Sequence, residues 1–88
     1  MKINENFLLR EVAGNAVVVP VGEAADRFSG MIKLNETGVA IWRALEKETD
    51  EDAVVAALLS EYDIDKETAR ADVRRFITTL RKAGILDD

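Results

Sequence analysis

Residues 31–42 read Met31-Ile32-Lys33-Leu34-Asn35-Glu36-Thr37-Gly38-Val39-Ala40-Ile41-Trp42, a short β-rich run that passes directly into a helical pattern. The run predicts a strand over Met31 to Leu34, and Asn35 is a residue type that favours the N-cap of a helix. Because no loop separates the two elements, we expect this strand to be the last of its sheet and to lie at an edge. An edge strand leaves backbone N–H and C=O groups unpaired on one side.

Two further β-rich runs precede this strand, Phe7 to Val12 and Ala16 to Val21. The Gly14-Asn15 pair between them predicts a tight hairpin turn with positive φ. Pro20 has no backbone N–H to donate, so we expect it to face outward or to end the pairing. Residues 22–30 are interpreted as a loop whose large apolar residue, Phe28, folds back onto the domain.

Three helices are predicted after the third strand, because apolar residues recur at three- to four-residue spacing. They cover Glu36 to Lys47, Thr49 to Tyr62 and Asp65 to Ala83, with Asn35, Thr49 and Asp65 as expected N-caps. Gly84 suits the left-handed turn after the last helix. The fold class is therefore α+β and winged-helix-like: a three-stranded antiparallel sheet followed by a three-helix bundle, in a single domain over residues 1–88.

The composition argues against catalysis and against a cofactor. The 88 residues include no cysteine and no histidine, which removes the commonest general base, the usual transition-metal ligands and the nucleophilic triads. We therefore expect no catalytic residue, no metal and no cofactor. The N-terminus lacks a secretion signal and no apolar run could cross a membrane, so a cytoplasmic location without membrane association is expected.

The net charge of −5 opposes binding to nucleic acid, which depends on neutralising phosphates. The charge is unevenly distributed, however. Residues 65–82 hold six basic and three acidic side chains, a local balance of +3 that leaves −8 on the remainder.

The third predicted helix has two distinguishable faces at about 100° per residue. Its buried face is expected to comprise Ala69, Val73, Phe76, Leu80 and Ala83. We expect Phe76→Ala to cost about 3–5 kcal/mol for that reason. A basic stripe beside this face comprises Lys66, Arg70, Arg74 and Arg81, with Ile77 inside its border. The stripe is interpreted either as a solvated face with intrahelical pairs, such as Glu67 with Arg70 or Arg74, or as the wall of a ligand groove.

Several motifs in order resemble the PqqD-like family over roughly residues 6–86. They are Leu34-Asn35-Glu36-Thr37-Gly38 with Ile41 and Leu45, Leu58 with Glu61-Tyr62-Asp63, Asp72-Val73 with Phe76 and Leu80, and Gly84-Ile85-Leu86. The resemblance implies a peptide chaperone, or precursor-peptide recognition element. Such a protein binds the leader of a ribosomally made peptide and presents it to a modifying enzyme, often a radical SAM protein. Quinone biosynthesis itself is not implied, because the family serves many pathways.

In this family the leader adds a strand beside the third strand, in a groove bordered by the third helix. Strand addition takes affinity from backbone hydrogen bonds and specificity from alternate side chains. Carried onto this sequence, the expected peptide-binding residues are Met31, Ile32, Lys33, Leu34, Arg70, Val73, Arg74, Ile77 and Arg81.

Two alternative functions remain open from the sequence. A winged-helix regulator would place the basic third helix in DNA, although a usual wing follows the recognition helix whereas this hairpin comes first. Alternatively, two copies could pair through the same edge strand. The expected state in solution is accordingly a monomer or a weak homodimer.

Overall fold

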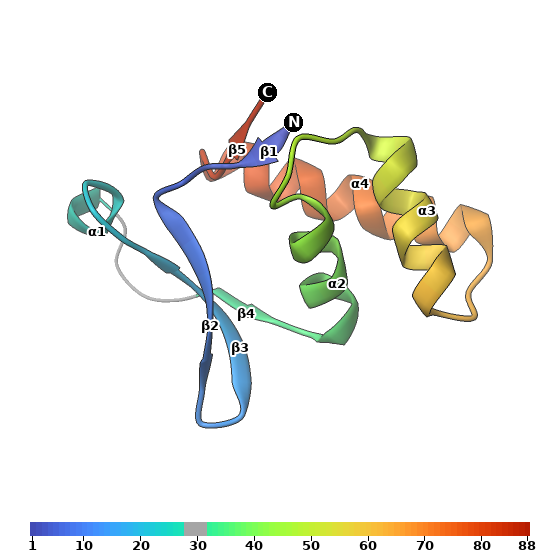
Figure 1. Cartoon of the computed structure of the whole chain (residues 1–88), viewed down its shortest axis with the longest axis horizontal. Helices are drawn as coiled ribbons and strands as arrows, with labels where there is room; N and C mark the ends of the chain where they lie inside the picture. Colours follow the sequence, from blue (N-terminus) through green and yellow to red (C-terminus); the bar gives the residue numbers. More distant parts are fainter. Residues whose placement is uncertain (28–31) are drawn as a thin grey trace.

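The computed structural model describes residues 1–27 and 32–88. Its strands are β1 (Lys2–Ile3), β2 (Phe7–Val12), β3 (Asn15–Pro20), β4 (Ile32–Leu34) and β5 (Leu86–Asp87). Its helices are α1 (Ala24–Arg27), α2 (Glu36–Ala44), α3 (Glu51–Glu61) and α4 (Lys66–Lys82). Strands β2, β3 and β4 form an antiparallel sheet in that order, on one side of the three longer helices (Figure 1). The predicted α+β class and the three-stranded antiparallel sheet are confirmed.

A second, two-stranded sheet joins the two ends of the chain, which lie side by side in Figure 1. β1 pairs with β5 in the register Lys2↔Asp87 and Ile3↔Leu86. The amide of Asn4 also donates to the carbonyl of Ile85 at 2.7 Å. This ribbon and the four-residue helix α1 could not be predicted from the sequence, because two-residue strands and single helical turns carry no periodic pattern.

The core lies between the helices and one face of the sheet. Trp42 is 1% exposed, and Leu45, Val54 and Ile85 in the same cluster are fully buried. The sheet contributes Phe7, Leu9, Val18 and Leu34 to the same cluster. Within the described ranges, no helix combines the length and the apolar character needed to span a bilayer.

Two of the three predicted N-caps are confirmed. The Asn35 side chain accepts from the amide of Gly38 at 2.8 Å, and the Asp65 side chain accepts from Thr68 at 2.7 Å. The third prediction is wrong by one residue, since Asp50 rather than Thr49 caps α3 by accepting from Ala53 at 2.8 Å. The backbone N–H of Thr49 instead donates to the carbonyl of Met1, and the N-terminal ammonium of Met1 donates to the carbonyl of Thr49.

Two other boundaries differ from the sequence prediction. α2 ends at Ala44 rather than Lys47, and the next carbonyl, that of Leu45, accepts from the amide of Ile3 at 2.8 Å. The positive φ angles of the hairpin turn belong to Ala13 (52°) and Gly14 (80°), so Asn15 is already in β3. Both central residues thus have the left-handed geometry of a two-residue type I′ turn. The expected fold-back of Phe28 lies outside the described residues.

Candidate functional site

The hairpin turn determines which backbone groups of the sheet are hydrogen-bonded and which are left unpaired at the edge of β4. In a two-residue hairpin the flanking residues, here Val12 and Asn15, form a hydrogen-bonded pair, and such pairs alternate along the ladder. By this alternation, the backbone N–H and C=O groups of Val17 bond to β2, whereas those of Ala16 and Val18 bond to β4. The alternation also puts Pro20, which has no N–H, in a non-hydrogen-bonded pair with Phe7. Pro20 ends its strand, as expected.

The same alternation identifies which residue of β4 offers its backbone to a partner. Ala16 pairs with Leu34 and Val18 with Ile32, so the N–H and C=O groups of these two β4 residues point toward β3. Lys33 pairs with Val17 in the non-hydrogen-bonded position, and its N–H and C=O groups therefore point away from the sheet. Lys33 is the residue whose backbone is available at this edge.

An open groove of about 240 Å³ lies where β4 passes into α2, against one face of α4. The half-buried ring of Phe76 and the buried Ile41 form its apolar part. Its remaining lining residues are Asn35, Thr37, Gly38, Asp72, Arg75 and Thr79. Ile32, which is 41% exposed, lies on the same face of the sheet as the half-buried Leu34. The edge of β4 is therefore bordered by one exposed apolar side chain, Ile32, and by the half-buried Leu34 and Phe76.

Gly38 allows the close approach of three elements at this groove. A Cβ atom built at this position would lie 3.0 Å from Asn35 Oδ1, and 3.4 Å from both Leu34 Cβ and Phe76 Cε2. These distances also place the Phe76 ring next to the last residue of β4. A side chain at residue 38 would fill the groove between Leu34 and Phe76.

The basic stripe predicted on α4 faces a different direction. At about 100° per residue, Arg70, Arg74 and Arg81 lie roughly 120–160° around the helix from Phe76. Arg70 Nη1 lies 2.8 Å from Glu51 Oε2 and 2.9 Å from Asp52 Oδ1, both at the start of α3. Arg74 Nε lies 3.0 Å from Glu51 Oε1. The expected intrahelical pairs with Glu67 are replaced by pairs between helices.

Glu51 is the centre of this ion-pair cluster. The hydrogen bond from Arg74 lowers the pKa of the Glu51 carboxyl most, desolvation partly opposes it, and the bond from Arg70 lowers it further. Arg81 pairs instead with Asp88 at 2.8 Å, and this hydrogen bond lowers the pKa of Asp88. The three arginines thus hold neighbouring segments of the chain, and none of them lines the groove beside β4.

The structure divides the predicted site residues into separate groups. Ile32, Lys33 and Leu34 form the edge strand, as expected, while Met31 lies outside the described residues. Val73 and Ile77 are 0% and 3% exposed and belong to the core. Ile77 lies beside Arg81, inside the border of the basic stripe as expected, but its side chain is buried rather than open to a ligand. The expectation that Phe76 is fully buried is wrong, because its ring is half-buried. The helix is rotated so that Ile77 packs inward and Phe76 faces the groove.

Three groove residues were not predicted from the sequence: Asp72, Arg75 and Thr79. Together with Phe76 they follow the spacing of one helical face, i, i+3, i+4 and i+7. Asp72 and Arg75 form a loose intrahelical pair, with Nη1 3.5 Å from Oδ1. That spacing was visible in the sequence, but nothing in it indicated which face of the helix borders β4.

The family comparison matches most of the chain. Residues 9–86 match the family described as coenzyme PQQ synthesis protein D (PqqD). No curated protein sequence matched the chain significantly.

Two solved structures share the fold. TbiB1 in complex with the TbiA(beta) leader peptide is 24% identical, with a TM-score of 0.77 over 99% of this chain and 95% of the other. Lasso peptide synthetase B1 complexed with the leader peptide is 20% identical, with a TM-score of 0.72 over 96% and 93% of the two chains. With the family match over residues 9–86, the chain belongs to the PqqD family.

Proposed function

We propose that this protein is a peptide-binding adaptor rather than an enzyme. It takes the leader of a ribosomally synthesised precursor peptide as an added strand on β4 and presents the peptide to a modifying enzyme. The open backbone edge at Lys33, directly beside the apolar groove at Phe76, carries the proposal. Both solved structures of the same fold contain a leader peptide, which supports it.

The peptide contacts follow from the geometry of strand addition. The leader bonds to the N–H and C=O groups of Lys33, and alternate leader side chains then point toward the groove face of α4. One apolar leader residue packs on Phe76 between Leu34 and Gly38. Arg75, exposed and only loosely paired with Asp72, is placed to bind an acidic leader side chain beside that anchor.

The residues that form the proposed site therefore differ in part from those expected from the sequence. They are Ile32, Lys33 and Leu34 from β4 with Asp72, Arg75, Phe76 and Thr79 from α4. The opposite side of α4 carries Arg70, Arg74 and Arg81. These arginines form ion pairs with Glu51 at the start of α3 and with Asp88 in the C-terminal segment. We place the adaptor in the cytoplasm, where a cysteine-free domain needs no disulfide framework.

Proline substitution at the strand edge tests the proposal. Lys33→Pro removes an outward-facing N–H, so it should abolish peptide binding while the β3–β4 ladder keeps its bonds. Lys33→Ala retains the N–H and should bind almost normally. Ile32→Pro removes a ladder bond instead and should destabilise the sheet.

The probe is a peptide selected on the wild-type protein from a displayed random library, titrated against each variant. Amide exchange of the complex should show new protection at Lys33. Binding that is equally strong in Lys33→Pro, with protection confined to α2 and α3, would place the site elsewhere.

The DNA-binding alternative has weaker support. Its principal cations on α4, namely Arg70, Arg74 and Arg81, already pair with Glu51, Asp52 and Asp88. The net charge of −5 also repels phosphates. A gel-shift series at low and high salt separates the two functions, since the adaptor should show no salt-sensitive DNA complex.

A further inference from the structure

The face of the sheet opposite the core has an unusual composition. Side chains alternate along each strand, so the core face carries Leu9, Val18 and Leu34 and the opposite face carries the intervening residues. We call the latter the outer face; it comprises Leu8, Arg10, Val12, Asn15, Val17, Val19 and Lys33. Four of these seven side chains are aliphatic and lie outside the main core cluster: Val12 is exposed, Leu8 and Val19 are half-buried, and Val17 is 6% exposed.

The exposed part of the outer face lies toward the hairpin turn. Val12 is 46% exposed, and it and Ile32 are the two exposed large apolar side chains within residues 1–27 and 32–88. Arg10, Asn15 and Lys33 are exposed as well. The β2–β3 hairpin extends beyond the helices, so its tip is open to a large partner (Figure 1).

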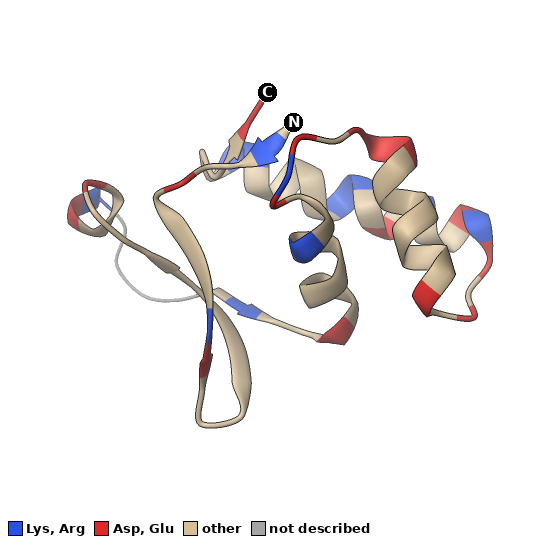
Figure 2. Ribbon diagram, in the orientation of Figure 1, with Lys and Arg blue, Asp and Glu red and all other residues tan. Residues whose placement is uncertain are grey.

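The charge of the outer face is opposite in sign to that of the whole protein. Arg10 and Lys33 flank Val17 in one cross-strand row, and the paired residues of β2, β3 and β4 place no acidic side chain on this face. β3 between them carries no charged residue (Figure 2). Neither cation forms an ion pair with any side chain in the described part of the chain. The exposed Val12 and the half-buried Leu8 and Val19, with these two cations beside them, are complementary to a partner surface that combines apolar side chains and carboxylates.

We propose that the outer face is the docking surface for the modifying enzyme, which meets it with an apolar patch edged by carboxylates. The inference rests on the proposed function, because an adaptor needs a second surface that stays free while the leader is bound. The leader uses the edge of β4 and the groove on the core side, so both partners can bind at once. A leader strand beside Lys33 would also extend the outer face, and the enzyme would then contact protein and leader together.

Two other occupants fit the outer face less well. A second copy of this chain would bring Arg10 and Lys33 into an interface that supplies no carboxylate from the same face. An anionic lipid surface would attract the two cations, but two are few for stable membrane association and the whole chain carries −5. Both occupants give distinct results in the experiment below.

The test begins with a photo-crosslinking residue at position 12 of the full-length protein in its own cells. A second crosslinker at Ala71, an exposed position on α4, serves as the control site. The protein joined through position 12 is identified, purified and titrated against the wild type, Arg10→Glu and Val12→Asp. Lys66→Glu, a charge reversal at an exposed position on α4, is the matched control.

The expected partner is a peptide-modifying enzyme that binds Arg10→Glu and Val12→Asp about tenfold or more weakly, since each new carboxylate repels its acidic edge. Lys66→Glu should bind like the wild type. Leader binding, measured with the library-selected peptide, should be unchanged in all three variants, so a loss there implicates the groove instead. Crosslinks only to a second copy, wild-type affinity in Arg10→Glu, or binding only to anionic vesicles would overturn the proposal.

Discussion

At the scale of single residues, a substitution at Gly38 should weaken peptide binding while leaving the stability of the fold nearly unchanged. Replacing a helical glycine with alanine gains about 0.5–1 kcal/mol, whereas the new Cβ would lie 3.0 Å from the Asn35 oxygen that caps α2. A lost cap costs about 1 kcal/mol, so Gly38→Ala should change the free energy of unfolding little. The methyl group enters the groove, and peptide affinity should fall. Titration and urea denaturation check the two effects.

Gly84→Ala is the contrasting control for that substitution. Gly84 has a φ of 74° and no atom near its missing Cβ. Alanine is strained at that angle, so this variant should lose stability and keep its affinity for the peptide. An equal loss of affinity in both variants would mean that the effect of Gly38→Ala is not local to the groove.

Phe76 and Ile77 are adjacent residues with different expected roles. Ile77 is 3% exposed in the core, and Ile77→Ala should cost about 2–5 kcal/mol. Phe76 is half-buried in the groove, so Phe76→Ala should cost less stability and remove most peptide binding. Urea denaturation and peptide titration of the two variants measure both quantities. A larger loss of stability for Phe76→Ala than for Ile77→Ala would contradict the orientation of α4.

At the scale of secondary-structure elements, Glu51 joins the start of α3 to α4. Its pKa is lower in the folded protein than the reference value of 4.5, mainly because Arg74 donates to the carboxylate. The stabilisation is therefore complete above the unfolded pKa of 4.5 and is lost as the pH falls through the lower folded value. Glu51→Gln should reduce stability by about 1 kcal/mol or less near neutral pH.

Acid denaturation of both proteins tests this prediction. The difference in the free energy of unfolding between wild type and Glu51→Gln should shrink as the pH is lowered below the unfolded pKa. A constant difference from neutral to acidic pH would mean that the ionised Glu51 does not carry the effect.

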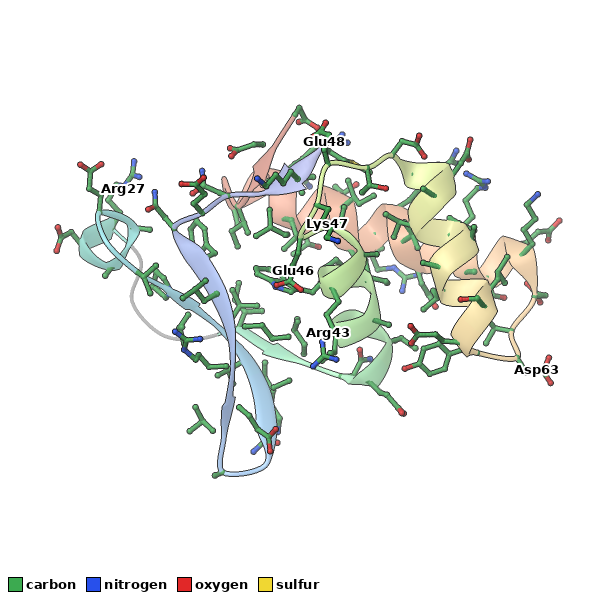
Figure 3. The ribbon with its side chains drawn as sticks, in the orientation of Figure 1. Arg27, Arg43, Glu46, Lys47, Glu48 and Asp63 are labelled. Carbon is green, nitrogen blue, oxygen red and sulfur yellow. The ribbon has the colours of Figure 1, made fainter. Side chains whose placement is uncertain are left out.

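The connections between the helices carry much of the remaining charge. Glu46, Lys47 and Glu48 follow α2, and Asp63 lies in the turn between α3 and α4 (Figure 3). Glu48 accepts from the N-terminal ammonium at 2.8 Å. All four charged residues are exposed and lie in the turns that connect the helices.

At the scale of the whole molecule, the β1–β5 ribbon ties both ends of the chain to the core. Deleting residues 86–88 removes Leu86, which is 8% exposed, together with its pairing to Ile3. Burial of one such side chain contributes about 1.5–3 kcal/mol, so the free energy of unfolding should fall by at least that amount. Deleting Asp88 alone removes only an exposed ion pair with Arg81, so it should change the free energy of unfolding little. Equal urea midpoints for the two deletions would show that the ribbon contributes nothing.

Most of the elements could be predicted from the sequence because their signals are local. Asn35 and Asp65 cap helices within three residues of themselves, and Gly84 takes the left-handed turn after α4. The two β-rich runs around Gly14 predicted the hairpin, although the turn residues are Ala13 and Gly14 rather than Gly14 and Asn15. The short distance from β4 to α2 indicated an edge strand before any contact was known. Residues close in the chain determine all of these features.

The candidate site depended on contacts that no local pattern contains. Phe76 and Ile77 are both apolar and lie about 100° apart on α4, so either could have faced the core. Packing against α2 and α3 turned Ile77 inward and left Phe76 beside Gly38 and Leu34. The same rotation directed Arg70 and Arg74 to Glu51. The sequence by itself determined the strand, the helix and the edge, whereas only the tertiary structure decided which face of α4 borders that edge, because helix rotation is set by close packing between distant segments.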